Sequence, residues 1–135
     1  MEFLLDTHAF LWYLLGDSNL GSKAKEAIDT KTGLYFSIAS LWEISIKINV
    51  GKLQLNRPFE DLSKELQYIN AQILPITLED TEIYAGLPMH HRDPFDRILV
   101  AQTMNHSLVL ISRDEAFDAY PIQRVWWWRM QKFDK

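Results

Sequence analysis

The sequence predicts an α/β protein, a three-layer α/β/α sandwich with a mostly parallel central sheet. Short apolar runs bounded by turn residues alternate with longer stretches of helical period. Strands separated by helices form βαβ units, whose crossovers are right-handed. The chain has 135 residues, of which 47% are hydrophobic, so we expect a single domain over residues 1–135 with a sizeable core.

The first half of the chain predicts two strands and three helices. Gly16 and Gly51 follow two of the helical stretches, and glycine commonly ends a helix because it adopts the left-handed conformation. The expected elements are a strand at 2–5, a helix at 8–15, a helix at 22–29, a strand at 34–38 and a helix at 40–51.

The second half continues the alternation. Pro58 near the start of one helical stretch and Pro94 at the first position of another both favour helix starts, with Asp93 as the N-cap before Pro94. The expected elements are a helix at 57–70, a strand at 73–76, a helix opened by a capping sequence at 77–80, a helix from Pro94 to about Asn105, a strand at 107–111 and a weaker strand at 122–126.

Four acidic residues stand where predicted strands end or helices begin. Asp6 directly follows the first strand, and Glu43 lies early in the helix after the second strand. Asp114 closely follows the fourth strand, and Asp96 lies in the first turn of the helix that leads into it. In a parallel sheet the carboxyl ends of the strands share one edge, so three of these acids should converge. Asp96 joins them only if the loop at 86–93 ends at the same edge, which spacing alone does not establish.

Each acid also has a purely structural interpretation. Asp6 would cap the first helix, and Asp96 would satisfy an amide in the first turn of its own helix. Glu43 would pair with Ser40 in a capping box, and Asp114 would begin a turn. Taken singly, these structural roles are the commoner ones; the recurrence of four acids at such positions favours a shared site.

Four carboxylates in one pocket repel one another unless a cation offsets their charge. A ligand set made only of oxygen suits hard ions, so we expect Mg²⁺ or Mn²⁺. Such an ion binds a phosphodiester, lowers the pKa of a bound water and stabilises the leaving oxygen. The candidate ligands and catalytic residues are Asp6, Glu43, Asp96 and Asp114.

Composition narrows the remaining classes of function. The chain has no cysteine, which excludes disulfides, thiolate metal sites and cysteine nucleophiles. Its formal net charge of −4 gives no general support to nucleic-acid binding, although a local basic rim can coexist with an acidic site. No apolar run approaches a membrane span, and the N-terminus lacks the basic region of a signal peptide, so we expect a soluble, cytoplasmic protein.

Several stretches resemble PIN-domain proteins, specifically the VapC-like toxin ribonucleases. The resemblance extends from residue 3 to about residue 126, and "HHRDPFDR" before an apolar helix is its most specific part. It implies a PIN-like α/β/α nuclease fold and Mg²⁺- or Mn²⁺-dependent endoribonuclease activity. The stretches that carry it are "FLLDTHAFLWYL", "FSIASLWEISIKINVGKL", "LPMHHRDPFDRILVAQ" and "LVLISRDEAF".

The resemblance also implies roles for individual residues. The four acids named above match the metal-binding positions of the family motifs, while Asp93 is an additional acid that we interpret first as a helix cap or a support for a ligand. Thr7 and Ser112 lie where hydroxyl groups of the family flank the site. His8 stands where many relatives carry Asn or Ser, a departure that concerns substrate positioning rather than the metal site.

The same resemblance implies partners. VapC-like proteins act on RNA, usually form homodimers, and are held inactive by a cognate antitoxin whose segment lies near the acids. The expected partners are therefore an RNA substrate, an antitoxin and a second copy of the chain, with no membrane.

Basic and aromatic residues near these motifs remain open to two interpretations. Arg92, with His90 and His91, would form a positive rim that contacts RNA, or else a solvated loop. Arg97 would bind a phosphate or pair with a neighbouring acid. In the run of three tryptophans at 126–128, strand alternation would bury the first and third, and packing is favoured over base stacking.

Three functions compete at this point. The first is a metal-dependent endoribonuclease, the toxin of a type II toxin–antitoxin pair. The second is a non-catalytic PIN-like module that binds RNA or protein without turnover. The third, phosphoryl transfer with Asp6 as nucleophile, ranks last: "DTH" lacks the second aspartate that haloacid-dehalogenase-like phosphatases usually have, and no phosphate-cradling glycine-rich loop is present.

Overall fold

A five-stranded parallel sheet forms the middle of the protein in the computed structural model, which describes residues 1–126. The strand order is β3-β2-β1-β4-β5, and every neighbouring pair is parallel. The strands are β1 (Phe3–Leu5), β2 (Leu34–Ser37), β3 (Ala71–Leu74), β4 (Val109–Ile111) and β5 (Gln123–Val125).

Six α-helices and two short 3₁₀ helices connect the strands. The α-helices are α1 (Thr7–Leu15), α2 (Ser22–Thr30), α3 (Ile38–Asn49), α4 (Leu62–Tyr68), α5 (Leu78–Ala85) and α6 (Pro94–Asn105). The 3₁₀ helices are η1 (Phe59–Asp61) and η2 (Glu115–Ala119). None of the helices within residues 1–126 is long and apolar enough to cross a membrane.

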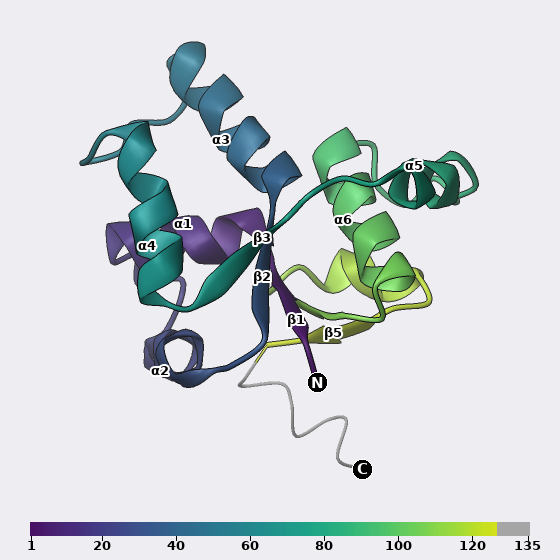
Figure 1. Cartoon of the computed structure of the whole chain (residues 1–135), viewed down its shortest axis with the longest axis horizontal. Helices are drawn as coiled ribbons and strands as arrows, with labels where there is room; N and C mark the ends of the chain where they lie inside the picture. The colour runs from purple at the N-terminus through teal and green to yellow at the C-terminus, as the bar shows by residue number, and fades with distance from the viewer. Residues whose placement is uncertain (127–135) are drawn as a thin grey trace.

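The predicted three-layer sandwich is confirmed (Figure 1). Alternation along β1 sends Phe3 and Leu5 to one core, where α1, α2 and α4 pack, and Leu4 to the other. The second core is closed by α6 and η2, and α5 lies against α6 on that side. In the first core the rings of Phe10 and Phe36, both fully buried, pack 4.5 Å apart.

The starts of α5 and α6 and the end of α1 follow the predicted capping chemistry. The Asp93 side chain accepts a hydrogen bond from the amide of Phe95 and caps α6, with Pro94 at the first position. Thr77 and Asp80 form a capping box at α5. Gly16 ends α1 in the left-handed conformation, with φ of 62°.

Several element boundaries differ from the predicted ones. The strand expected at 73–76 lies two residues earlier, as β3. The helix expected at 57–70 begins only with η1 and continues as the shorter α4. The helix expected at 40–51 begins at Ile38, because the Ser37 hydroxyl accepts from the Ala39 amide and caps it there.

Candidate metal centre

Asp6 lies at the carboxyl end of β1 and is almost fully buried, with 5% of its surface exposed. It occupies the N-cap position of α1, yet its side chain makes no capping hydrogen bond. Instead, the hydroxyl of Ser112, just beyond β4, donates to Asp6 Oδ2 at 2.7 Å. Burial raises the pKa of Asp6, and this hydrogen bond offsets part of the effect. Asp6 therefore has no helix-capping role to explain its burial.

Asp96 is half-buried in the first turn of α6. Its carboxylate accepts no hydrogen bond from any residue within the described part of the chain. Burial raises the pKa of Asp96 to about 6, and the negative charges of Asp93, Asp6 and Glu43 contribute in the same direction. The start of α6 thus does reach the edge of the sheet where Asp6 and Glu43 lie, the placement that spacing alone left open.

Glu43 projects from α3 with only 5% of its surface exposed. Its Oε2 forms an ion pair of 3.1 Å with Lys47 Nζ, one turn further along the helix. The expected capping box with Ser40 does not form, because Ser37 caps α3 and the Ser40 hydroxyl accepts a 2.6 Å hydrogen bond from Thr7 Oγ1. Glu43 is therefore a buried acid that forms an ion pair with Lys47 of its own helix.

Asp114 lies at the mouth of the site and is exposed. Its side chain accepts from the Ala116 amide and begins η2, so the interpretation as a turn starter is confirmed. It is nevertheless close enough to Asp6 to raise the pKa of that residue further. Its own amide donates to the Ser112 hydroxyl at 3.0 Å, so Ser112 joins Asp6 to Asp114.

A family model now settles the fold family. The model of the PIN domain matches residues 3–123. The chain belongs to the PIN-domain family. A comparison with curated proteins gives no match.

Solved structures with the same fold are distant in sequence. FitAcB from Neisseria gonorrhoeae is 20% identical with a TM-score of 0.67, covering 93% of this chain and 98% of the other. VapBC2 from Rickettsia felis, bound to a DNA fragment from its promoter, is 15% identical with a TM-score of 0.65 over the same shares. A toxin–antitoxin complex from Klebsiella pneumoniae is 19% identical with a TM-score of 0.64, covering 93% and 97%. At these identities the likeness shows the fold alone.

Arg97 has a different position in this PIN domain from the one expected. Its side chain is buried, and its guanidinium donates to the carbonyl oxygens of Pro88 and Leu87 and lies 4.9 Å from the Tyr84 ring. These contacts hold the loop before α6 rather than a phosphate or an acid. Arg92 lies in the same loop and is exposed.

His91 is the feature that sequence reasoning underestimated. Its ring stacks on Phe117 and Tyr120, and its Nε2 lies 3.4 Å from Asp114 Oδ2. The amide of His91 also donates to the Tyr120 hydroxyl at 2.9 Å. His90 packs edge-on against Tyr120. The contact between His91 and Asp114 could not be predicted from residue spacing, because the two residues are more than 20 positions apart.

The donor set fits a hard divalent cation by its chemistry. All candidate ligands are carboxylate oxygens, and two of them carry pKa values raised by burial and mutual repulsion, the strain that a cation would relieve. Within residues 1–126, however, no three Asp, Glu or His side chains stand close enough to form a complete coordination sphere. The assignment of Asp6, Glu43, Asp96 and Asp114 as metal ligands thus stays a prediction.

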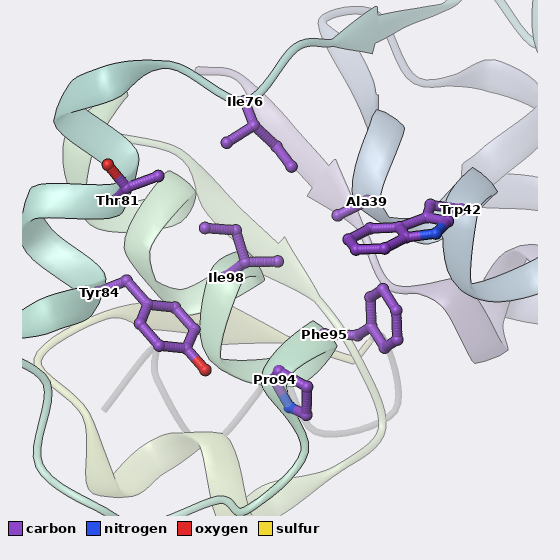
Figure 2. A pocket seen from close by; sticks show the side chains of 8 residues that line it. All are labelled: Ala39, Trp42, Ile76, Thr81, Tyr84, Pro94, Phe95 and Ile98. Carbon is purple, nitrogen blue, oxygen red and sulfur yellow. The ribbon is translucent and has the colours of Figure 1, made fainter.

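Two hollows are lined by candidate acids or by residues next to them in the chain. One, of about 330 Å³, is lined by Asp6, His8, Trp12, Arg113 and Asp114. The other, of about 300 Å³, lies between α3, α5 and α6, and Figure 2 shows Trp42 and Phe95 on one side facing Tyr84 and Ile98. The lining of the second hollow is almost wholly apolar, so it offers no ligand for a metal or phosphate. Of these two hollows, the first has carboxylates in its lining.

Of the three tryptophans in the C-terminal run, the structure describes Trp126. It is buried as expected, and its ring packs edge-on against Trp12 at 6.2 Å. The prediction for Trp127 and Trp128 lies outside the described residues.

Proposed function

We propose that this PIN domain is a Mg²⁺- or Mn²⁺-dependent endoribonuclease that hydrolyses RNA phosphodiester bonds. The observation that carries the proposal is that Asp6 and Glu43 are buried and Asp96 is half-buried, although the three acids come from distant parts of the chain, and that the first two help to raise the pKa of the third. Buried carboxylates without a matching set of cations are costly to keep, so their retention at one edge of the sheet favours a functional reason. The family model and the fold support the same class.

Asp6 and Asp96 would be the principal ligands of the ion, with Glu43 and Asp114 as direct ligands, ligands through water, or groups that orient the nucleophile. When bound, a divalent ion would lower the pKa of water and stabilise negative charge at phosphorus. The chain itself holds the acids in place. Ser112 fixes Asp6 through its hydroxyl, and Lys47 keeps the Glu43 carboxylate from swinging towards solvent.

We further propose that the protein is the toxin of a type II toxin–antitoxin pair, acting in the cytoplasm as a homodimer that a cognate antitoxin inhibits. Support comes from the similar solved structures, one of which is described as a toxin–antitoxin complex and another as FitAB bound to a DNA fragment. Co-expression with the product of an adjacent reading frame, followed by co-purification and light scattering, tests the antitoxin and the dimer together. Recovery of only a monomer without a partner would contradict both.

The test of the nuclease uses a labelled single-stranded RNA with Mn²⁺, comparing wild type with Asp6→Asn and Asp96→Asn. We expect cleavage by wild type, none with EDTA, and a loss of at least about 100-fold in both variants, since each removes a charged group needed for charge stabilisation. Glu26→Gln, an exposed acid on α2, is the matched control and should cleave normally. Full cleavage by both site variants would reject the assigned site.

The alternative is a PIN-like module that binds RNA or protein without turnover. It is favoured by one observation, that the described acids do not form a complete coordination sphere. It predicts RNA binding or partner capture without cleavage in Mn²⁺, and little change when Glu43→Gln is made. Isothermal titration with Mn²⁺ separates the two, because the nuclease requires a site that Asp6→Asn weakens.

A further inference from the structure

The hollow that contains Asp6 and Asp114 is also lined by aromatic and basic side chains, which a metal site does not require. Asp6 and Asp114 form one end, and the remaining lining is an imidazole, an indole and a guanidinium, from His8, Trp12 and Arg113. Its volume of about 330 Å³ is at the small end of ligand pockets, the scale of a single nucleotide unit rather than a folded nucleic acid. A hollow that joins carboxylates to aromatic rings and one fixed cation is suited to a ligand with both a phosphate and a planar base.

His8 and Trp12 share one face of α1. They are four residues apart, so successive turns place them one above the other, and their rings lie 6.2 Å apart. His8 is exposed and close enough to Asp6 for its charge to lower the pKa of that carboxyl. Trp12 is half-buried, and its ring packs edge-on against that of Trp126. The indole is therefore held in place at the wall of the hollow and does not need to be ordered when a ligand arrives.

Arg113 lines the same hollow and lies near the Trp12 ring. Its guanidinium carbon lies 5.9 Å from the centre of the Trp12 ring, and its Nη1 is 3.3 Å from Asn19 Oδ1 and 3.4 Å from the Asn19 carbonyl oxygen. Asn19 belongs to the turn after α1, so this contact ties the strand end that bears Arg113 to the helix that bears Trp12. The cation is exposed and faces no carboxylate within ion-pair distance in the described residues.

We propose that this hollow is a subsite for one unpaired nucleotide of an RNA strand next to the scissile phosphate, with the base on Trp12 and His8 and a backbone phosphate on Arg113. The inference rests on the proposed nuclease function and adds the feature of the substrate that the site selects. Sequence-tolerant RNA binding uses aromatic side chains on which unstacked bases lie, together with cations along the backbone. A base inside a duplex cannot reach Trp12 without leaving its stack, so the subsite favours single-stranded or loop RNA.

The experiment measures cleavage of a ten-nucleotide single-stranded RNA with Mn²⁺, and of a set of RNAs that each carry one abasic nucleotide. We expect one abasic position, adjacent to the cleaved bond, to raise KM for wild type by roughly 5- to 150-fold, the range of one base–aromatic stack. Trp12→Leu should raise KM on intact RNA by a similar factor and be insensitive to the abasic change at that position. Trp12→Phe keeps a ring and should retain most of the affinity.

Arg113→Gln tests the phosphate contact separately. It should weaken binding to every RNA in the set equally, and the slope of log affinity against log salt should become shallower by about 0.7, the value for one phosphate on a single strand. Binding is read by fluorescence anisotropy in EDTA. Tyr68→Leu, an aromatic residue on α4 with 77% of its surface exposed, and Lys23→Gln on α2 are the matched controls for loss of a ring and of a charge.

Different outcomes distinguish the subsite from the nuclease. If wild type cleaves RNA while every abasic change, Trp12→Leu and His8→Asn leave KM unaltered, the subsite is wrong and the nuclease stands. If wild type does not cleave but the abasic effect appears in binding, the nuclease is wrong, and the hollow stands as a site that binds one nucleotide without cleavage beside it. Should Trp12→Leu fail to fold, as judged by circular dichroism, the abasic series on wild type, Trp12→Phe and His8→Asn decides between these outcomes. Equal affinity for duplex and single-stranded RNA would also overturn the inference.

Discussion

Removing the charge of Asp96 should stabilise the metal-free protein above pH 6. The pKa of this carboxyl is about 6 in the folded chain against an ordinary value of 3.8, because burial and the neighbouring acids disfavour its ionised form. Between these two pH values the folded state binds more protons than the unfolded state, so the free energy of unfolding falls as the pH rises. The loss of unfolding free energy that ionised Asp96 causes is complete above about pH 6 and absent below about pH 4.

The size of the effect follows from the two pKa values. At 1.36 kcal/mol per pKa unit, the difference between 3.8 and about 6 gives an upper limit of about 3 kcal/mol. Because Asp96 is only half-buried, water screens its neighbours, and about 1 kcal/mol is the expected gain for Asp96→Asn. The gain should appear at pH 7 to 8 and vanish at pH 4.

Urea unfolding of wild type and Asp96→Asn in EDTA, between pH 4 and pH 8, measures this directly. Glu26→Gln is the control for removing an acid from the surface, and its stability should follow wild type across the series. Addition of Mn²⁺ should make wild type more stable than Asp96→Asn. At a Mn²⁺ concentration 100 times the dissociation constant, a bound ion raises the free energy of unfolding of wild type by about 2.7 kcal/mol, and that of Asp96→Asn should rise much less. A variant that is less stable than wild type at pH 8 in EDTA would refute the electrostatic argument.

Three further predictions test the framework around the acids. Ser112→Ala removes the hydroxyl that donates to buried Asp6 and should cost about 1–3 kcal/mol at pH 7, measured by urea unfolding; no loss would show that the 2.7 Å contact is unimportant. Arg97→Met should remove the guanidinium contacts that hold the loop before α6, so a protease should cut this loop faster in the variant. An unchanged rate of proteolysis would contradict this role of Arg97. His91→Phe keeps the ring stacking but loses the contact with Asp114, so kcat of the proposed nuclease should fall while the melting temperature holds; a fall in both would indicate a packing role.

The order and type of the elements could be predicted from the sequence because local periodicity and capping chemistry are short-range. Asp93, Pro94 and Thr77 fix helix starts through hydrogen bonds within three residues of themselves, and Gly16 ends a helix through its own backbone conformation. The predicted start of a helix was wrong where its N-cap residue was not recognised in the sequence. Ser37, which looked like the end of a strand, starts α3 at Ile38.

The candidate acids could likewise be picked out, since they recur at strand ends, but their environments could not. Sequence did not distinguish buried Asp6, supported by Ser112, from exposed Asp114, which also caps η2. Nor did it show that Arg97, next to Asp96 in the chain, points into the loop before α6 instead of the site. Neighbours in sequence point in different directions on a helix, so adjacency says little about shared contacts.

The sequence by itself determined the fold class, the caps of α1, α5 and α6 and the choice of candidate acids, because each of these depends on patterns a few residues long. Only the tertiary structure decided that the start of α6 meets the end of β1 and the first half of α3, and that His8, Trp12 and Arg113 line one hollow. The reason is physical: burial, charge coupling and pocket shape arise from side chains separated by tens of residues, and they exist only once the sheet is assembled.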